Sequence, residues 1–114
     1  MTGIASDWTN ETNGTAVVLA ANGRIDESTA DAFKDFLLSA MERGPATAII
    51  DLGDIDYMSS RGLRALTLAQ RASQDAGTTI VLARPNDTMR EILAISRYDM
   101  VFRVADTIEE ALGH

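Results

Sequence analysis

The chain has 114 residues, a length that predicts one domain with a single core over residues 1–114. Hydrophobic residues make up 46% of the sequence and charged residues 24%, which is typical of a folded chain and excludes a disordered one. Acidic residues outnumber basic ones by 17 to 10, giving a net charge of -7, so neither nucleic acid nor an anionic membrane is expected as a direct partner.

Residue types that bind metals or form disulfides are scarce. No cysteine is present and the single histidine, His114, provides no imidazole cluster, so any metal site would need carboxylates alone. No cofactor is therefore expected. The N-terminal residues have neither a basic start nor an apolar segment of the kind that directs export, which favours a cytoplasmic protein.

The first predicted element is a β-hairpin. Residues 15–20 are rich in β-branched and apolar side chains and lie between two Asn-Gly pairs, so they predict a strand that pairs with residues 4–10. A long helix is expected next, because apolar residues recur at helical spacing until Gly44 and Pro45 end the pattern: Phe33, Leu37, Ala40 and Met41.

The middle of the chain predicts a buried strand and a second helix. Residues 46–52 form a continuous apolar run, typical of a central strand covered on both faces. From Ser60 onward, small and apolar residues lie on one stripe, so this helix is expected to approach the sheet closely and to end at Gly77. The members of the stripe are Gly62, Ala65, Leu66, Ala69, Ala72 and Ala76.

The C-terminal part continues the alternation of strands and helices. It predicts a strand at 78–83, a short helix opened by 85–88, a strand at 101–104 and a final helical turn at 107–112. Such alternation is typical of an α/β fold, here with a mixed sheet of about five strands and about four helices. Residues 24–29 and 54–60 are expected as loops at the carboxyl ends of the strands, where function usually lies.

Common enzyme motifs are absent from these predicted loops. Tyr57 and Met58 stand where a nucleophile elbow needs glycine, and Gly53 and Gly62 are too far apart for a phosphate-binding loop. Four carboxylates could hold a hard cation such as Mg²⁺, although aspartate also ends strands and fills turns, which is the favoured interpretation: Asp26, Asp51, Asp54 and Asp56.

The segment 49–63 contains a strand, Asp51-Leu52, a short loop, and then Ser59-Ser60-Arg61-Gly62-Leu63 at the start of a helix. This pattern resembles the signature of STAS domains, and especially of bacterial anti-sigma factor antagonists. Gly23-Arg24-Ile25-Asp26 is similar to the family's Gly-x-Leu-Asp motif, and residues 89–102 resemble its short helix and last strand. The resemblance covers nearly the whole chain and implies the STAS fold, which opens with a β-hairpin.

The resemblance implies a regulatory binding protein and not an enzyme. An antagonist of this family captures an anti-sigma factor, frequently a GHKL-type serine kinase, while it is unphosphorylated. Phosphorylation of a serine at the start of the second helix reverses the capture, and a PP2C-type phosphatase restores it. A phosphate adds about -1.5 to -2 charges at that position.

One departure from the family pattern concerns the phosphorylated serine. The commonest pattern is Asp-Ser-Ser-Gly-Leu, in which the second serine accepts the phosphate. Alignment on Gly62 and Leu63 places Arg61 at that position, so Ser60 is the favoured phosphoacceptor, with Ser59 second. Two alternatives stay open: one serine only caps the helix, or the domain is a constitutive scaffold that is never phosphorylated.

The residues expected to bind the partner lie around these serines: Asp26, Met58, Arg61, Gly62 and Arg64. The resemblance implies that Asp26 belongs to an acidic rim where the magnesium-bound nucleotide of a kinase approaches, although Asp26 could simply cap a helix. Met58, with Tyr57, could form an apolar contact or pack into the core. Arg61 and Arg64 either contact an acidic partner or a phosphate, or form a solvated helix face.

Overall fold

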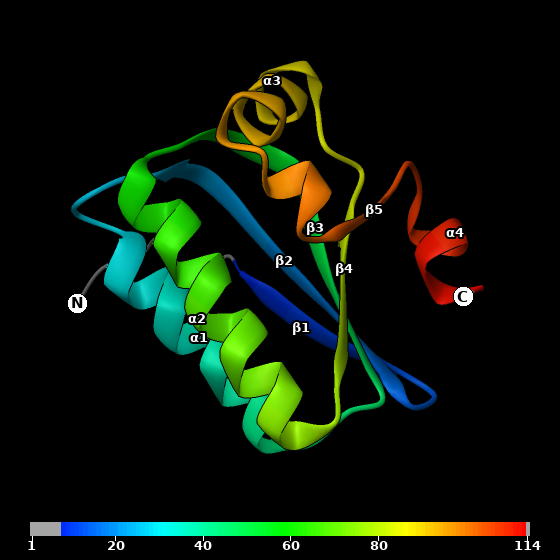
Figure 1. Ribbon diagram of the computed structural model, residues 1–114. Coiled ribbons are helices and arrows are strands. Elements are labelled where there is room, and N and C mark those ends of the chain that lie inside the picture. The colour runs from blue at the N-terminus through cyan, green and yellow to red at the C-terminus, as the bar shows by residue number, and fades with distance from the viewer. Residues whose placement is uncertain (1–7, 114) are drawn as a thin grey trace.

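The structure is a computed structural model that describes residues 8–113 as a five-stranded mixed sheet with helices on both faces (Figure 1). The strands lie side by side in the order in which they occur in the sequence: β1 (Thr9–Asn13), β2 (Ala16–Ile25), β3 (Thr47–Met58), β4 (Thr79–Ala83) and β5 (Arg103–Ala105). β1 pairs antiparallel with β2, and the remaining pairs are parallel. This arrangement confirms the opening hairpin, although residues 4–7 of its predicted first strand lie outside the described residues.

Helices connect the parallel strands, as predicted. They are α1 (Ala30–Glu42), α2 (Ser60–Ala76), α3 (Asp87–Ser96) and α4 (Ile108–Leu112), with a short 3₁₀ turn, η2 (Tyr98–Met100), before β5. Gly77 ends α2 in the left-handed conformation, with φ of 74°, which glycine adopts without steric cost. Within residues 8–113, none of the helices combines the length and the apolar character needed to cross a membrane.

The main core lies between the sheet and the pair α1 and α2, which run side by side (Figure 1). Ile50 and Leu82 point to this side of the sheet, and α3 closes one end of the core with Met89 and Leu93. The predicted stripe on α2 is buried from Gly62 to Ala69, but further along Ser73 is buried while Ala76 is exposed. The buried face of α2 therefore extends as far as Ser73, and only the last turn of the predicted stripe, at Ala76, lies outside the core.

The opposite face of the sheet is covered by α4. Ile49 and Val81 alternate with the residues of the main core and pack with Ala83 and Ala111 into a second, smaller cluster. β3 and β4 are thus buried on both faces, which explains their continuous apolar sequences. Together, the sheet order and the helices confirm the predicted α/β class.

β2 and β3 are longer than predicted. Parallel pairing runs from Asn22 opposite Asp54 to Ile25 opposite Met58, so it includes residues 24–25 and 54–58, which were expected to belong to loops. The register shifts twice along this extension, and Gly23 adopts a φ of 81° there. For these residues the prediction of loops was wrong, because polar and glycine residues can also lie in an irregular stretch of strand when a neighbouring strand supplies the hydrogen bonds. Residues 26–29 do form the predicted connection before α1.

Candidate functional site

The candidate site lies where β3 ends and α2 begins. Ser59 is the N-cap of α2, because its Oγ accepts a hydrogen bond from the Gly62 amide at 3.4 Å. The Ser59 amide donates to the Ile25 carbonyl oxygen at 2.8 Å, and this bond continues the pairing of the two strands. Ser59 is half-buried, so its hydroxyl and its backbone both belong to the junction.

Ser60 is the first residue of α2 and is exposed. The capping bond of the helix is made by its neighbour Ser59, so the Ser60 hydroxyl is not required for it. The two adjacent serines therefore differ in their roles: one supports the fold, and the other is presented at the surface.

Met58 and Gly62 pack under the junction. Met58 is only 2% exposed, and Gly62 is buried in the first turn of α2. A Cβ atom on Gly62 would lie 2.5 Å from the Met58 Cγ and 2.8 Å from the Ile25 Cγ2. The absence of a side chain at position 62 thus lets α2 lie directly on the ends of β2 and β3. A direct contact of Met58 or Gly62 with a partner stays a prediction.

Asp26 lies in the turn between β2 and α1, at the same edge of the sheet. Its carboxylate accepts hydrogen bonds from the Ser28 amide at 3.0 Å and the Ser28 hydroxyl at 2.8 Å, and it forms an ion pair with Arg24 at 3.7 Å. The hydrogen bonds from Ser28 are the main cause that lowers the pKa of Asp26, with a smaller contribution from Arg24. Asp26 is therefore a turn residue that stays ionised and partly accessible, beside the start of α2.

Buried Thr29 holds this turn in place. Its hydroxyl donates to the Arg24 carbonyl oxygen at 2.7 Å and accepts from the Asp26 amide at 2.9 Å. Arg24 lies near the end of β2, and its guanidinium lies over the ring of Tyr57 on the neighbouring strand β3, 4.6 Å from the ring centroid. Arg24 was not among the predicted site residues, because its contact with Tyr57 depends on the strand register.

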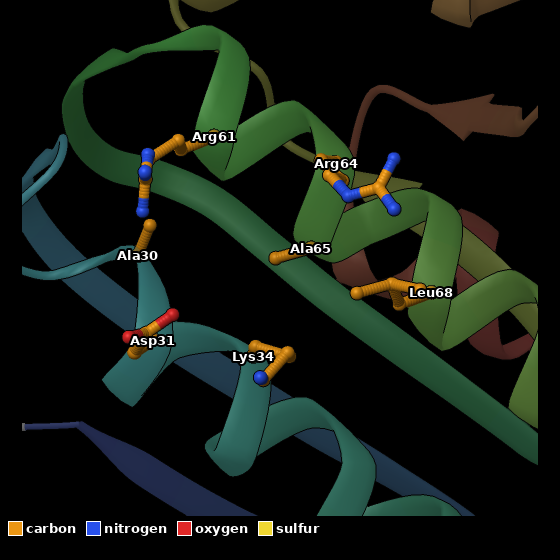
Figure 2. Close-up of a pocket in the computed structure, with 7 residues that line it drawn as sticks. All are labelled: Ala30, Asp31, Lys34, Arg61, Arg64, Ala65 and Leu68. Carbon is orange, nitrogen blue, oxygen red and sulfur yellow. The ribbon is translucent and has the colours of Figure 1, made fainter.

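Arg61 and Arg64 line a hollow of about 330 Å³ between α1 and α2. The other lining residues are Ala30, Asp31, Lys34, Ala65 and Leu68. Figure 2 shows the Arg61 side chain extending toward the start of α1, while the Arg64 side chain points away from α1. We call this feature the basic hollow. Lys34 was missed as a site residue because only the packing of α1 against α2 brings it near the two arginines.

The four carboxylates that could have held a cation have separate roles or positions. Asp51 binds the Arg84 guanidinium through two hydrogen bonds, of 2.9 and 3.2 Å, whereas Asp26 is held by Ser28. Asp54 and Asp56 are exposed on the long end of β3. Across residues 8–113, no group of three or more histidine and carboxylate side chains is arranged to hold a metal ion.

These features define a STAS domain. The STAS domain family matches residues 7–111, and the chain belongs to this family. It is similar to RsfB of Mycobacterium tuberculosis, an anti-sigma-F factor antagonist, with 31% identity over 88% of this chain and 80% of that protein. It is also similar to BtrV of Bordetella bronchiseptica, with 27% identity over 83% of this chain and 82% of that protein.

Solved structures share the same fold. A crystal structure of an anti-sigma factor antagonist from Mycobacterium paratuberculosis superposes with a TM-score of 0.81 at 22% identity, covering 93% of this chain and 90% of that one. The anti-sigma factor antagonist SpoIIAA in its unphosphorylated form gives a TM-score of 0.76 at 21% identity, covering 92% of each chain. The phosphorylated form of SpoIIAA from Bacillus gives 0.66 at 24% identity, covering 93% of this chain and 96% of that one.

Proposed function

We propose that this protein is an anti-sigma factor antagonist whose binding is switched off by phosphorylation of Ser60. In its unphosphorylated form it binds an anti-sigma factor that is also a GHKL-type serine kinase, and a PP2C-type phosphatase restores binding. Membership of the STAS family and the similarity to RsfB support this role. Because sigma factors act on RNA polymerase, this exchange of partners takes place in the cytoplasm.

The different positions of the two serines carry the assignment to Ser60. A kinase must reach the hydroxyl it modifies, and Ser60 is exposed while Ser59 is half-buried and caps α2. A phosphate on Ser60 would meet the positive end of the helix dipole, so the fold can tolerate it. It would also change the charge of the surface around Arg61 and Arg64, which we propose contacts the partner together with Asp26. Met58 and Gly62, which are buried, would support this surface from beneath.

Asp26 fits the role of an acidic rim beside the phosphoacceptor. Ile25 pairs with Met58, and the Ser59 amide bonds to the Ile25 carbonyl, so the turn that holds Asp26 adjoins the start of α2. The carboxylate of Asp26 is charged at neutral pH, as its ordinary pKa of 3.8 already requires, and the hydrogen bonds from Ser28 lower that pKa further. A charged, partly exposed carboxylate is suited to the approach of a kinase's magnesium-bound nucleotide.

Mass spectrometry tests the modification. The purified protein is incubated with ATP and a GHKL-type anti-sigma factor encoded by the same genome. We expect one phosphate on Ser60, which Ser60→Ala removes and Ser59→Ala does not, and which a PP2C-type phosphatase hydrolyses. Phosphate on Ser59 alone would contradict the assignment of Ser60.

Binding measurements by calorimetry test the switch. Ser60→Asp is expected to weaken binding to the anti-sigma factor at least about tenfold, equivalent to about 1.4 kcal/mol. Gln74→Glu is the matched control, because it adds one negative charge at an exposed position near the other end of α2. Unchanged affinity in the double variant Ser59→Asp/Ser60→Asp would contradict a phosphorylation switch.

A second function, that of a constitutive scaffold, is favoured by the position of Arg61. Arg61 stands where the family pattern has its phosphoacceptor serine, and its side chain extends toward α1 (Figure 2). A scaffold would bind its partner with the same affinity before and after incubation with kinase and ATP, and neither serine would carry phosphate. The mass spectrum therefore separates the two functions.

A further inference from the structure

The basic hollow concentrates positive charge on a protein that is acidic as a whole. Three cationic side chains, Lys34, Arg61 and Arg64, line it together with one carboxylate, Asp31, whereas the chain has a net charge of -7. The cations come from two helices, so the arrangement depends on how α1 packs against α2 (Figure 2). The floor contains the small buried residues Ala30 and Ala65, which leave room for a side chain to enter between the helices.

Lys34, Arg61 and Arg64 take part in none of the ion pairs formed among residues 8–113. The ion pairs among residues 8–113 involve Arg24, Arg84 and Arg90, which bind Asp26, Asp51 and Asp106. Arg61 and Arg64 also lie in the first two turns of α2, whose first turn contains no acidic residue. Cations are unfavourable near the positive end of a helix dipole, so this placement weakens the fold slightly.

We propose that the basic hollow receives an acidic segment of the anti-sigma factor, with a carboxylate bound by Arg61 and Lys34. This inference rests on the proposed function and names the chemistry of its partner. Guanidinium groups bind carboxylates through two parallel hydrogen bonds, and Lys34 adds a point charge from α1. A long polyanion such as nucleic acid would also meet the acidic remainder of the surface, whereas a short acidic segment contacts the hollow alone.

The same arrangement explains how a phosphate on Ser60 releases the partner. Ser60 and Arg64 are four residues apart on α2, so their side chains are neighbours on the helix surface. Phosphoserine forms strong charge-assisted hydrogen bonds with arginine. The phosphate therefore pairs with Arg64 within the chain and lowers the positive charge that the acidic segment needs.

A model peptide tests the hollow without the partner. Hexaglutamate is titrated into ¹⁵N-labelled protein at constant ionic strength, and amide shifts are followed by NMR. We expect saturable shifts of the amide signals of Ala30, Arg61 and Ala65. The affinity for hexaglutamate derived from these shifts should fall at least threefold in Lys34→Gln and in Arg61→Gln. Arg71→Gln is the matched control, because Arg71 is exposed on α2 outside the hollow. No saturable shift at these residues, or equal binding by the Arg61→Gln variant, overturns the inference.

Charge reversal tests the same site against the anti-sigma factor. Arg61→Glu and Lys34→Glu are each expected to weaken binding at least tenfold and to reduce its salt dependence, while Arg71→Glu changes affinity less than twofold. If Ser60→Asp abolishes binding but both reversals leave it unchanged, the inference is overturned and the proposed function stands. If hexaglutamate occupies the hollow but phosphorylation leaves the affinity for the anti-sigma factor unchanged, the switch fails and the hollow remains an acceptor of acidic segments.

Discussion

α2 and α3 both begin where a parallel strand ends, and both are capped by a polar side chain that accepts a hydrogen bond from an amide three residues further on. Ser59 accepts from Gly62 at 3.4 Å, and Asn86 accepts from Met89 at 2.9 Å. The two junctions lie along the same edge of the sheet, and each follows a buried strand (Figure 1). They differ in how many side chains tie them to the rest of the fold.

The start of α3 is tied to β3 by several side-chain bonds. The Asn86 amide group donates to the Gly53 and Ile55 carbonyl oxygens, at 3.2 and 2.8 Å. Arg84, which adopts a left-handed φ of 55°, binds Asp51 through both its Nε and Nη2 atoms. The Asn86 bonds satisfy two carbonyl groups on the end of β3 that extends beyond its pairing with β4, and the Arg84 bonds hold the Asp51 carboxylate where that pairing ends.

The start of α2 is held mainly by backbone pairing and by the close approach of Gly62, and its first turn presents Ser60 and Arg61 to solvent. The comparison shows that one connection, from strand to capped helix, can serve two purposes. Side chains directed inward make the α3 junction a support for the sheet, whereas side chains directed outward leave the α2 junction accessible from solvent, as the proposed function requires.

Asn86→Ala is expected to have the largest effect on stability. It removes the cap of α3 and both bonds to β3, and we expect a loss of about 2 to 3 kcal/mol in the free energy of unfolding, measured by urea denaturation. Asn86→Ser is the control, because serine can retain the cap but cannot bridge to both carbonyl groups, so its loss is expected to be about half as large. A loss below about 1 kcal/mol for Asn86→Ala would contradict the claim that the Asn86 side chain holds the start of α3 on β3.

Gly62→Ala should destabilise the α2 junction by about 1 to 2 kcal/mol. Alanine favours helix over glycine by up to about 1 kcal/mol, but the new methyl group would overlap the buried side chains of Met58 and Ile25. Gly53→Ala is the comparison, since the nearest atoms to its methyl group belong to the Arg84 guanidinium, which is 43% exposed and can shift at the expense of its ion pair with Asp51. Thermal unfolding that ranks Gly53→Ala as the more damaging change would reverse this interpretation.

The two serines should differ in how much their replacement by alanine lowers the free energy of unfolding. Ser59→Ala is expected to cost about 0.5 to 1 kcal/mol, because the capping bond it removes is long, while Ser60→Ala is expected to stay within about 0.5 kcal/mol of the unmodified protein. Urea denaturation of both variants measures the difference. Equal losses would show that Ser60 also supports the helix start, which would weaken its assignment as the free phosphoacceptor.

The pH dependence associated with Asp26 is expected to be the smallest effect. Its folded-state pKa is lowered from 3.8, so its contribution to stability is present above that value and is lost as the pH falls through the lower folded-state pKa. NMR titration of the carboxyl carbon should give a pKa below 3.8, and Ser28→Ala should raise it. An unchanged pKa in Ser28→Ala would show that Ser28 is not the main cause of the shift.

Local patterns in the sequence predicted the order of the helices and strands, and the family to which the protein belongs. Periodic apolar residues predicted the helices and the buried strands, and glycine and proline predicted where they end. The segment from Ser59 to Leu63 indicated the STAS family, which the match over residues 7–111 confirms. These predictions succeeded because each depends on residues that are close together in the chain.

Tertiary structure decided the features that join distant segments. Pairing between β2 and β3 placed parts of two predicted loops, residues 24–25 and 54–58, in strands, and packing of α1 on α2 brought Lys34 near Arg61. The difference between Ser59 and Ser60 also emerged only in three dimensions, because the geometry of the first turn of α2 determines which hydroxyl caps the helix and which faces solvent. Strand register and helix packing depend on contacts between remote residues, which no local pattern encodes.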